Sequence, residues 1–196
     1  EHIQTDMRAT TVQRLTRKFG VDAVQANRVS RVACGLFRQM RPGMSESQAG
    51  RLENKLAWAA QLHEIGAQIS HSDYHKHGAY ILGNSDAPGF SLSELERLGQ
   101  LVLGHRGKLA KLSIDYNDVT FVQQLLALRL AVVLCHARRD PDLKDLMVAC
   151  NLNAPRRVSI SLRAGWAEAW PQSAHLLREE VNAWQRTPWN LQILLA

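Results

Sequence analysis

The sequence predicts a mainly helical protein: an all-helical body followed by a small ββαβ unit. Apolar residues recur at three- and four-residue steps through most of residues 5–137, which is typical of amphipathic helices. Past Pro141 they alternate instead, which is typical of strands in a sheet. We therefore predict a helical domain over residues 1–140 and a small α+β domain over residues 141–196.

The first two helices are recognised by their ends. Residues 5–19 carry one apolar face and stop at Gly20, a natural residue for a helix C-terminus. Asp22 can cap the second helix, and the Arg-Pro-Gly sequence at residues 41–43 stops it. Its predicted core stripe consists of Val24, Val29, Val32, Ala33, Leu36 and Met40. The polar residues up to Gly50 are predicted to form a loop.

A central stretch, residues 58–82, holds half of the eight histidines of the chain: His63, His71, His75 and His77. Helical spacing puts His63 on the same face as Leu56 and Ala59, so the His63-Glu64 pair should point inward or into a cleft. A second helix is predicted to begin near Asp73, with His71 and His75 at its mouth. Unpaired backbone N–H groups at such an end favour a phosphate. The alternative is a hydrogen-bonded helix junction with solvated histidines.

A basic loop follows the next predicted helix. Ser91 and Glu94 form a capping box that opens this helix, which runs through Val102 to His105. The loop then carries three cations beside the histidine: Arg106, Lys108 and Lys111. It is either a phosphate-binding edge or an ordinary solvated loop.

Residues 119–137, capped by Asp118, are apolar on nearly every face and should form the central core helix. Arg129 lies within it, and a buried charge needs a partner. We expect Arg129 either to pair with a carboxylate, with Glu64 as one candidate, or to face the cleft.

The C-terminal residues predict the ββαβ unit. Alternating apolar residues over 146–152 and 158–162, separated by a turn at 153–157, predict a hairpin. Helical spacing returns over 171–184, and residues 191–195 predict a last strand.

Composition points to an anionic partner. The net charge is +6 and the pI is near 9.6. Because aromatic residues are few, phosphate groups are expected rather than bases, and nucleic acid is an unlikely partner. No run approaches the roughly 18 apolar residues of a membrane span.

The cysteines indicate the cellular compartment, and the first residue indicates that the chain is part of a longer protein. Cys34, Cys135 and Cys150 form no paired motif, which favours a reducing cytoplasm. The chain starts with Glu rather than Met, so we expect it to be part of a longer protein.

The sequence LHEIG at residues 62–66 resembles the HD signature of metal-dependent phosphohydrolases, which binds metal through an early His, a His-Asp pair and a late Asp. His63 matches the pair, but Glu64 replaces the Asp. Arg28 stands where the early His is expected and Val132 where the late Asp is expected. These degenerate positions, with His105, leave too few donors for a catalytic ion, so no bound metal is expected.

A second resemblance covers almost the whole chain. The segments LHEIG, HSDYHKHGAYIL and NSDAPGF, together with DMRATTVQRLTRKFGVD and VLGHRGKLAKL, look like the C-terminal half of the exopolyphosphatase/guanosine pentaphosphate phosphatase (Ppx/GppA) family. This resemblance implies an HD-domain-like helical bundle and a small α+β tail. In the family these follow two actin-like domains, which carry the hydrolytic site and its Mg²⁺. No glycine-rich phosphate loop of those domains matches here, so we expect no catalytic residue and no cofactor in this chain.

The resemblance implies a division of labour. The parent enzyme would remove terminal phosphates from inorganic polyphosphate, or the 5′ phosphate of guanosine pentaphosphate. This part would bind the polyanion in a basic channel and support a homodimer, without hydrolysis of its own. The candidate ligand-binding residues are His71, His75, His77, Arg106, Lys108 and Lys111, with Arg129 and Arg28 as inner members.

Two other functions remain open from the sequence. An autonomous HD-type metal-dependent phosphohydrolase would depend on His63 and His105. A regulatory module that binds guanosine tetra- or pentaphosphate would need an aromatic side chain in the cleft, and Tyr74 and Tyr80 are the nearest candidates.

Overall fold

The fold is known from a computed structural model that describes residues 2–41, 43–153 and 156–196. Helices make up its first part: α1 (His2–Lys18), α2 (Ala23–Gln39), α3 (Glu46–Leu62), the 3-10 turn η1 (Ile65–Gln68), α4 (Tyr74–Asn84), α5 (Leu92–Gly104), the 3-10 turn η2 (Leu109–Lys111) and α6 (Val119–Leu134). Its last part holds β1 (Met147–Asn151), β2 (Arg157–Leu162), α7 (Trp166–Ala169), α8 (Pro171–Trp184) and β3 (Asn190–Leu195). The predicted mainly α fold with a small α+β tail is confirmed, whereas the division at residue 140 stays a prediction.

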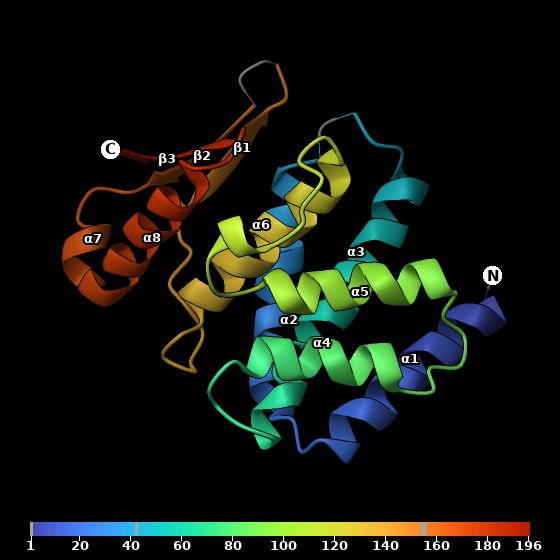
Figure 1. Ribbon diagram of the computed structural model, residues 1–196. Helices are drawn as coiled ribbons and strands as arrows, with labels where there is room; N and C mark the ends of the chain where they lie inside the picture. The colour runs from blue at the N-terminus through green and yellow to red at the C-terminus, as the bar shows by residue number, and fades with distance from the viewer. Residues whose placement is uncertain (1, 42, 154–155) are drawn as a thin grey trace.

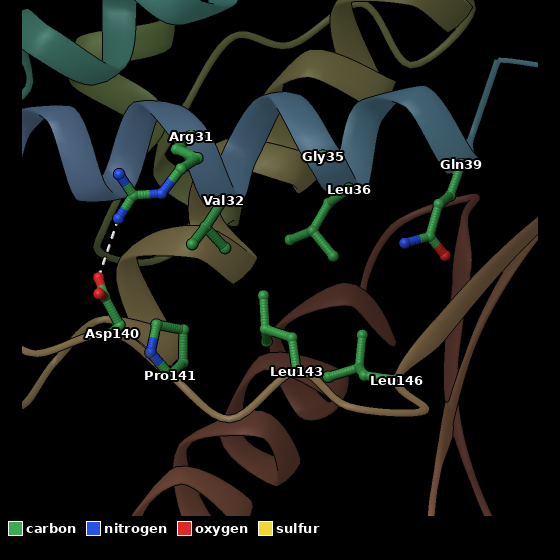
Figure 2. A pocket seen from close by; sticks show the side chains of 9 residues that line it. All are labelled: Arg31, Val32, Gly35, Leu36, Gln39, Asp140, Pro141, Leu143 and Leu146. Carbon is green, nitrogen blue, oxygen red and sulfur yellow. Dashed lines mark hydrogen bonds and ion pairs between the residues drawn. The ribbon is translucent and has the colours of Figure 1, made fainter.

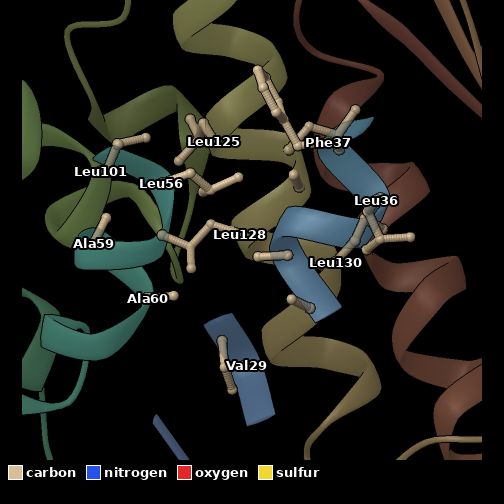
Figure 3. Close-up of a cluster of buried hydrophobic side chains, with 14 of the residues drawn as sticks. Val29, Leu36, Phe37, Leu56, Ala59, Ala60, Leu101, Leu125, Leu128 and Leu130 are labelled. Atoms are coloured by element: carbon tan, nitrogen blue, oxygen red, sulfur yellow. The ribbon is translucent and has the colours of Figure 1, made fainter. Parts of the chain in front are cut away.

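Helix α6 is the centre of the molecule, as predicted. Most of its side chains are buried. The helix lies between the other helices on one side and the sheet with α7 and α8 on the other (Figure 1). Figure 3 shows Leu125, Leu128 and Leu130 packed among side chains of α2, α3 and α5. A helix that is apolar all round can only be stable inside such a shell.

The ends of most helices follow local capping signals. The Asp22 carboxylate accepts hydrogen bonds from the backbone N–H groups of Val24 and Gln25, and Asp118 accepts one from Phe121. Ser91 and Glu94 form the complete capping box. Helix α4 differs, because Asp73 has a left-handed φ of 55° and its side chain caps nothing. The predicted start of α4 near Asp73 is correct.

Two predictions about α2 and α3 are wrong. The segment up to Gly50 is not a loop throughout, because Ser45 accepts a hydrogen bond from the Gln48 N–H and starts α3 at Glu46. This serine followed three residues later by Gln is itself a helix-start signal. Val24 is 67% exposed rather than part of the core stripe, since it lies in the first turn of α2, next to the cap.

The strands form one three-stranded sheet in the order β1-β2-β3. β1 and β2 are antiparallel with Val148 opposite Ile160, as the predicted hairpin requires. Two residues of its predicted turn, Ala154 and Pro155, lie outside the described residues. β3 pairs parallel to β2 with Val158 opposite Leu191, and α8 provides the crossover that parallel strands need. The short helix α7 was not predicted.

Within the described ranges, no helix combines the length and the apolar character needed to cross a membrane.

Candidate functional site

The central histidine stretch folds as a bend between α3 and α4. His63 caps the C-terminus of α3, and the residue is only 2% exposed. Its Nδ1–H donates to the carbonyl of Ala60. Because a carbonyl can only accept, this contact fixes the ring as the Nδ1–H tautomer and leaves Nε2 as an acceptor. The prediction that His63 points inward is confirmed.

His105 repeats this arrangement at the C-terminus of α5. Its Nδ1–H donates to the Val102 carbonyl at 2.5 Å, and its buried Nε2 has no hydrogen-bond partner. The His63 and His105 rings lie 5.0 Å apart, centre to centre, and are nearly perpendicular. Two helix ends therefore bring two imidazoles together, each held by its own backbone.

Helix α4 adds a third buried imidazole. The His75 ring lies 6.3 Å from His105, and its buried Nδ1 has no hydrogen-bond partner. The neighbouring Tyr74 ring lies 5.3 Å from His105, and the Arg106 guanidinium lies 4.6 Å above Tyr74. We call His63, His75 and His105 the histidine cluster.

Two glycines allow α4 to approach this bend. A Cβ atom on Gly66 would lie 2.1 Å from the Tyr74 carbonyl oxygen and 2.5 Å from the Gly78 nitrogen. A Cβ atom on Gly78 would meet the Val102 side chain at 2.9 Å. Backbone therefore packs directly on backbone here, and this contact fixes the position of the first turn of α4, which carries His75 and His77.

Burial keeps the histidine cluster uncharged. It lowers the pKa of His63, although the Ala60 hydrogen bond and Glu64 partly oppose this. Burial, with the neighbouring His63, lowers the pKa of His105 well below its usual value. Burial also lowers the pKa of His75, and the nearby Arg106 lowers it further. At neutral pH these three imidazoles are hydrogen-bonding groups rather than cations.

Arg129 holds the backbone of the basic loop after α5, which we call the anchored basic loop. This buried guanidinium donates to the carbonyls of Gly104 at 2.8 Å and Gly107 at 3.1 Å. It also pairs with the Glu180 carboxylate at 2.6 Å. The expectation of a carboxylate partner is confirmed, but the suggestion of Glu64 is wrong. This buried ion pair joins α6, α8 and the loop.

Glu64 is paired with Arg138 instead. The Arg138 guanidinium donates to Glu64 at 3.2 Å and to Asp22 at 3.0 Å, so it links the histidine bend to the start of α2. Sequence reasoning missed both Arg138 and Glu180. Each lies far along the chain from its partner, and no local pattern marks such a pair.

The predicted ligand-binding residues differ in their surroundings. Arg106, Lys108 and Lys111 are exposed on the basic loop, and His71 is exposed in the turn before α4. His77 is half-buried and His75 is buried. A Cβ atom on Gly107 would lie 3.4 Å from Nε2 of His75, so the loop and α4 are close neighbours. The Arg28 guanidinium donates hydrogen bonds to the Asp140 carboxylate at 3.1 Å and to the Gln25 side-chain oxygen on its own helix.

The histidine cluster does not fit a divalent ion. Over the described part of the chain, no group of three or more His, Cys, Asp or Glu side chains could hold one. The Glu64 carboxylate forms an ion pair with Arg138. Arg28, which stands at the position of the early HD histidine, forms an ion pair with Asp140. A catalytic metal needs at least three converging protein donors.

Comparison with known proteins matches this chain to a family and to longer relatives. Residues 7–183 match the family described as "Ppx/GppA phosphatase, domain III". A relative from Pseudoalteromonas translucida (strain TAC 125), named guanosine-5'-triphosphate,3'-diphosphate pyrophosphatase, is 30% identical over 190 residues. The match covers 95% of this chain but only 37% of the relative, so the chain spans just over a third of that protein's length.

Proposed function

Because this chain belongs to the Ppx/GppA phosphatase family, we propose that it is the anion-binding C-terminal region of a phosphatase whose hydrolytic domains lie elsewhere in a longer protein. Its ligand would be a linear polyphosphate chain, and its task would be to hold the part of that chain distant from the scissile phosphate. Binding energy collected there positions the reacting end.

The observation that carries this proposal is the anchored basic loop. Arg106, Lys108 and Lys111 are exposed, whereas the backbone beneath them is fixed by the buried Arg129–Glu180 pair. Because the loop backbone is already held, it need not be ordered when the cations bind an anion, so that part of the entropy cost of binding is avoided. A net charge of +6 adds long-range attraction for a polyanion.

The histidines would have a different role from the cations. His75 is uncharged at neutral pH and would act as a hydrogen-bonding group beside Arg106. His71 and His77 lie before and within the first turn of α4 and would contact phosphate oxygens there. Arg129 would act by holding the loop, and Arg28 would have to exchange Asp140 for a phosphate.

Binding of labelled long-chain polyphosphate to the chain, followed by fluorescence anisotropy, tests the proposal. The triple variant Arg106→Ala/Lys108→Ala/Lys111→Ala should bind about 10- to 100-fold more weakly, since three exposed charge contacts are worth roughly 0.5–1 kcal/mol each. The matched control is Arg157→Ala/Arg178→Ala/Arg186→Ala, which removes the same charge from exposed residues of the tail. Equal weakening by both triple variants would disprove a localised site.

A second candidate ligand is a guanosine polyphosphate, because the relative's name specifies one. Tyr74 is already covered by Arg106 and His105, whereas Tyr80 is 70% exposed on α4 and could stack on a base. Calorimetry with guanosine pentaphosphate and with short polyphosphate of matched charge separates the two ligands. Tyr80→Ala should weaken only the nucleotide.

Four further expectations belong to the same proposal. The parent protein would use Mg²⁺ in its hydrolytic domains, and the chain alone would release no phosphate. It would work as a homodimer. It would work in the cytoplasm, where its three free cysteines stay reduced.

A further inference from the structure

A cavity of about 500 Å³ lies between α2 and the segment that leads into β1 (Figure 2). Val32 and Leu36 face it from α2, while Pro141, Leu143 and Leu146 face it from the segment. Its size falls within the range of small-molecule sites, which often form where two parts of a protein meet.

The cavity is lined mainly by apolar residues, with Arg31, Gln39 and Asp140 as its polar part, and Gly35 adds no side chain to it. Val32, Leu36 and Leu146 belong to the buried core, and the half-buried Leu143 packs against it. Gly35 lies between Val32 and Leu36 on the same helix. No heavy atom lies within 4 Å of the place where its Cβ would be, so the space before Gly35 is empty.

At one end of the cavity, positive charges outnumber negative ones. Arg31 donates to the Asp140 carboxylate at 2.9 Å, as drawn in Figure 2, and Arg28 donates to the same oxygen at 3.1 Å. Two guanidinium groups therefore share one carboxylate, which leaves a net positive charge. The Arg31 side chain is 66% exposed, so it can turn from Asp140 to a bound anion at little cost.

We propose that this cavity binds a small amphipathic anion, whose apolar body lies against Leu36, Leu143 and Leu146 and whose carboxylate or phosphate binds Arg31. Inorganic polyphosphate has no apolar part, so this site differs in kind from the anchored basic loop. A ligand here would contact both α2 and the segment before β1, and would stabilise their contact. The carboxylate of a medium-chain fatty acid and the phosphate of a nucleotide share this chemistry.

Two fluorescent probes of similar shape test the proposal on the intact chain. Anilinonaphthalene sulfonate is an amphipathic anion, and N-phenyl-1-naphthylamine is its uncharged counterpart. Arg31→Gln should weaken the anion about tenfold, as expected for loss of one charge-assisted contact, and leave the uncharged probe unchanged. Gly35→Leu fills the empty space and should weaken both probes at least about tenfold, because either body needs that space.

The control is Gly50→Leu, which adds the same side chain to α3, where no atom lies within 4 Å of the new Cβ. It should leave both probes unchanged, and circular dichroism should show native helix content in every variant. Equal probe binding by Gly35→Leu and the unmodified chain would overturn the proposal. Equal weakening of both probes by Arg31→Gln would also overturn it.

Competition identifies the source of the anion. Displacement of the anionic probe by octanoate but not octanol, or by guanosine monophosphate but not guanosine, supports the site and names its ligand class. Displacement by neither anion would overturn it.

Discussion

Three buried imidazoles make the stability of this chain depend on pH. In the folded state the pKa values of His63, His75 and His105 are lowered, whereas in the unfolded chain they return to about 6.5. Below that pH the unfolded state binds more protons. The free energy of unfolding should therefore fall as pH drops from 6.5 toward 5, by up to about 1.4 kcal/mol per pH unit for each histidine.

Urea unfolding at a series of pH values measures this slope. His105→Asn keeps an N–H donor near Nδ1 but removes the titrating ring, so its slope should be smaller. The control His71→Asn replaces an exposed histidine, for which no change of slope is expected. Identical slopes for the His105→Asn variant and the unmodified chain would contradict the buried neutral state.

The Arg129–Glu180 pair is expected to be the most costly ion pair to break. Glu180→Ala leaves a guanidinium that is 6% exposed without its carboxylate, and it also removes the acceptor of the Trp184 indole N–H. The free energy of unfolding should fall by about 3–5 kcal/mol. Glu179→Ala removes an exposed carboxylate on the same helix and should change it by less than about 1 kcal/mol. Urea unfolding measures both values. Similar decreases in the free energy of unfolding for the two variants would show that the buried pair stabilises the fold no more than an exposed carboxylate does.

At the residue scale, the sequence predicted the buried direction of His63, though not the exposure of Val24, and it could not predict long-range partners. His63 points inward because helical spacing alone fixes its face. Arg129 needed a carboxylate, yet Glu180 lies 51 residues away on α8. Only the packing of α8 on α6 selects Glu180 over Glu64.

At the element scale, the contact between η1 and α4 depends on Gly66. Gly66→Ala places a methyl group against the backbone of Tyr74 and Gly78, and backbone cannot move aside as a side chain can. We expect the free energy of unfolding to fall by at least about 3 kcal/mol, or the variant not to fold at all. Gly99→Ala is the control, since it adds a methyl group in open space within α5 and should stabilise the chain by about 0.5–1 kcal/mol. Thermal unfolding of both variants distinguishes backbone packing from helix propensity, because propensity alone would make Gly66→Ala harmless.

Element boundaries were predictable where the signal is local. Asp22, Ser91 with Glu94, and Asp118 each hydrogen-bond to the first turn of their own helix, and the sequence shows all of them. The start of α4 is different. It is set by the tertiary contact at Gly66 rather than by a side-chain cap, since the Asp73 side chain caps nothing.

At the scale of the whole molecule, the fold class could be predicted from periodicity. The change from helical to alternating spacing of apolar residues does not depend on which tertiary contacts form. The parallel pairing of β3 with β2 does not follow from spacing alone, since alternation does not give strand direction. The basic loop of the candidate site could be read from the sequence because its residues are consecutive, whereas the Arg129–Glu180 pair that holds it comes from α6 and α8.

The central claim is that the exposed basic loop and the first turn of α4 hold a polyanion. Titration of the isotopically labelled chain with long-chain polyphosphate, followed by amide chemical shifts, tests it most directly. We predict the largest shifts at residues 105–112 and 71–77. Large shifts confined to other surfaces, with these two segments unchanged, would contradict the account.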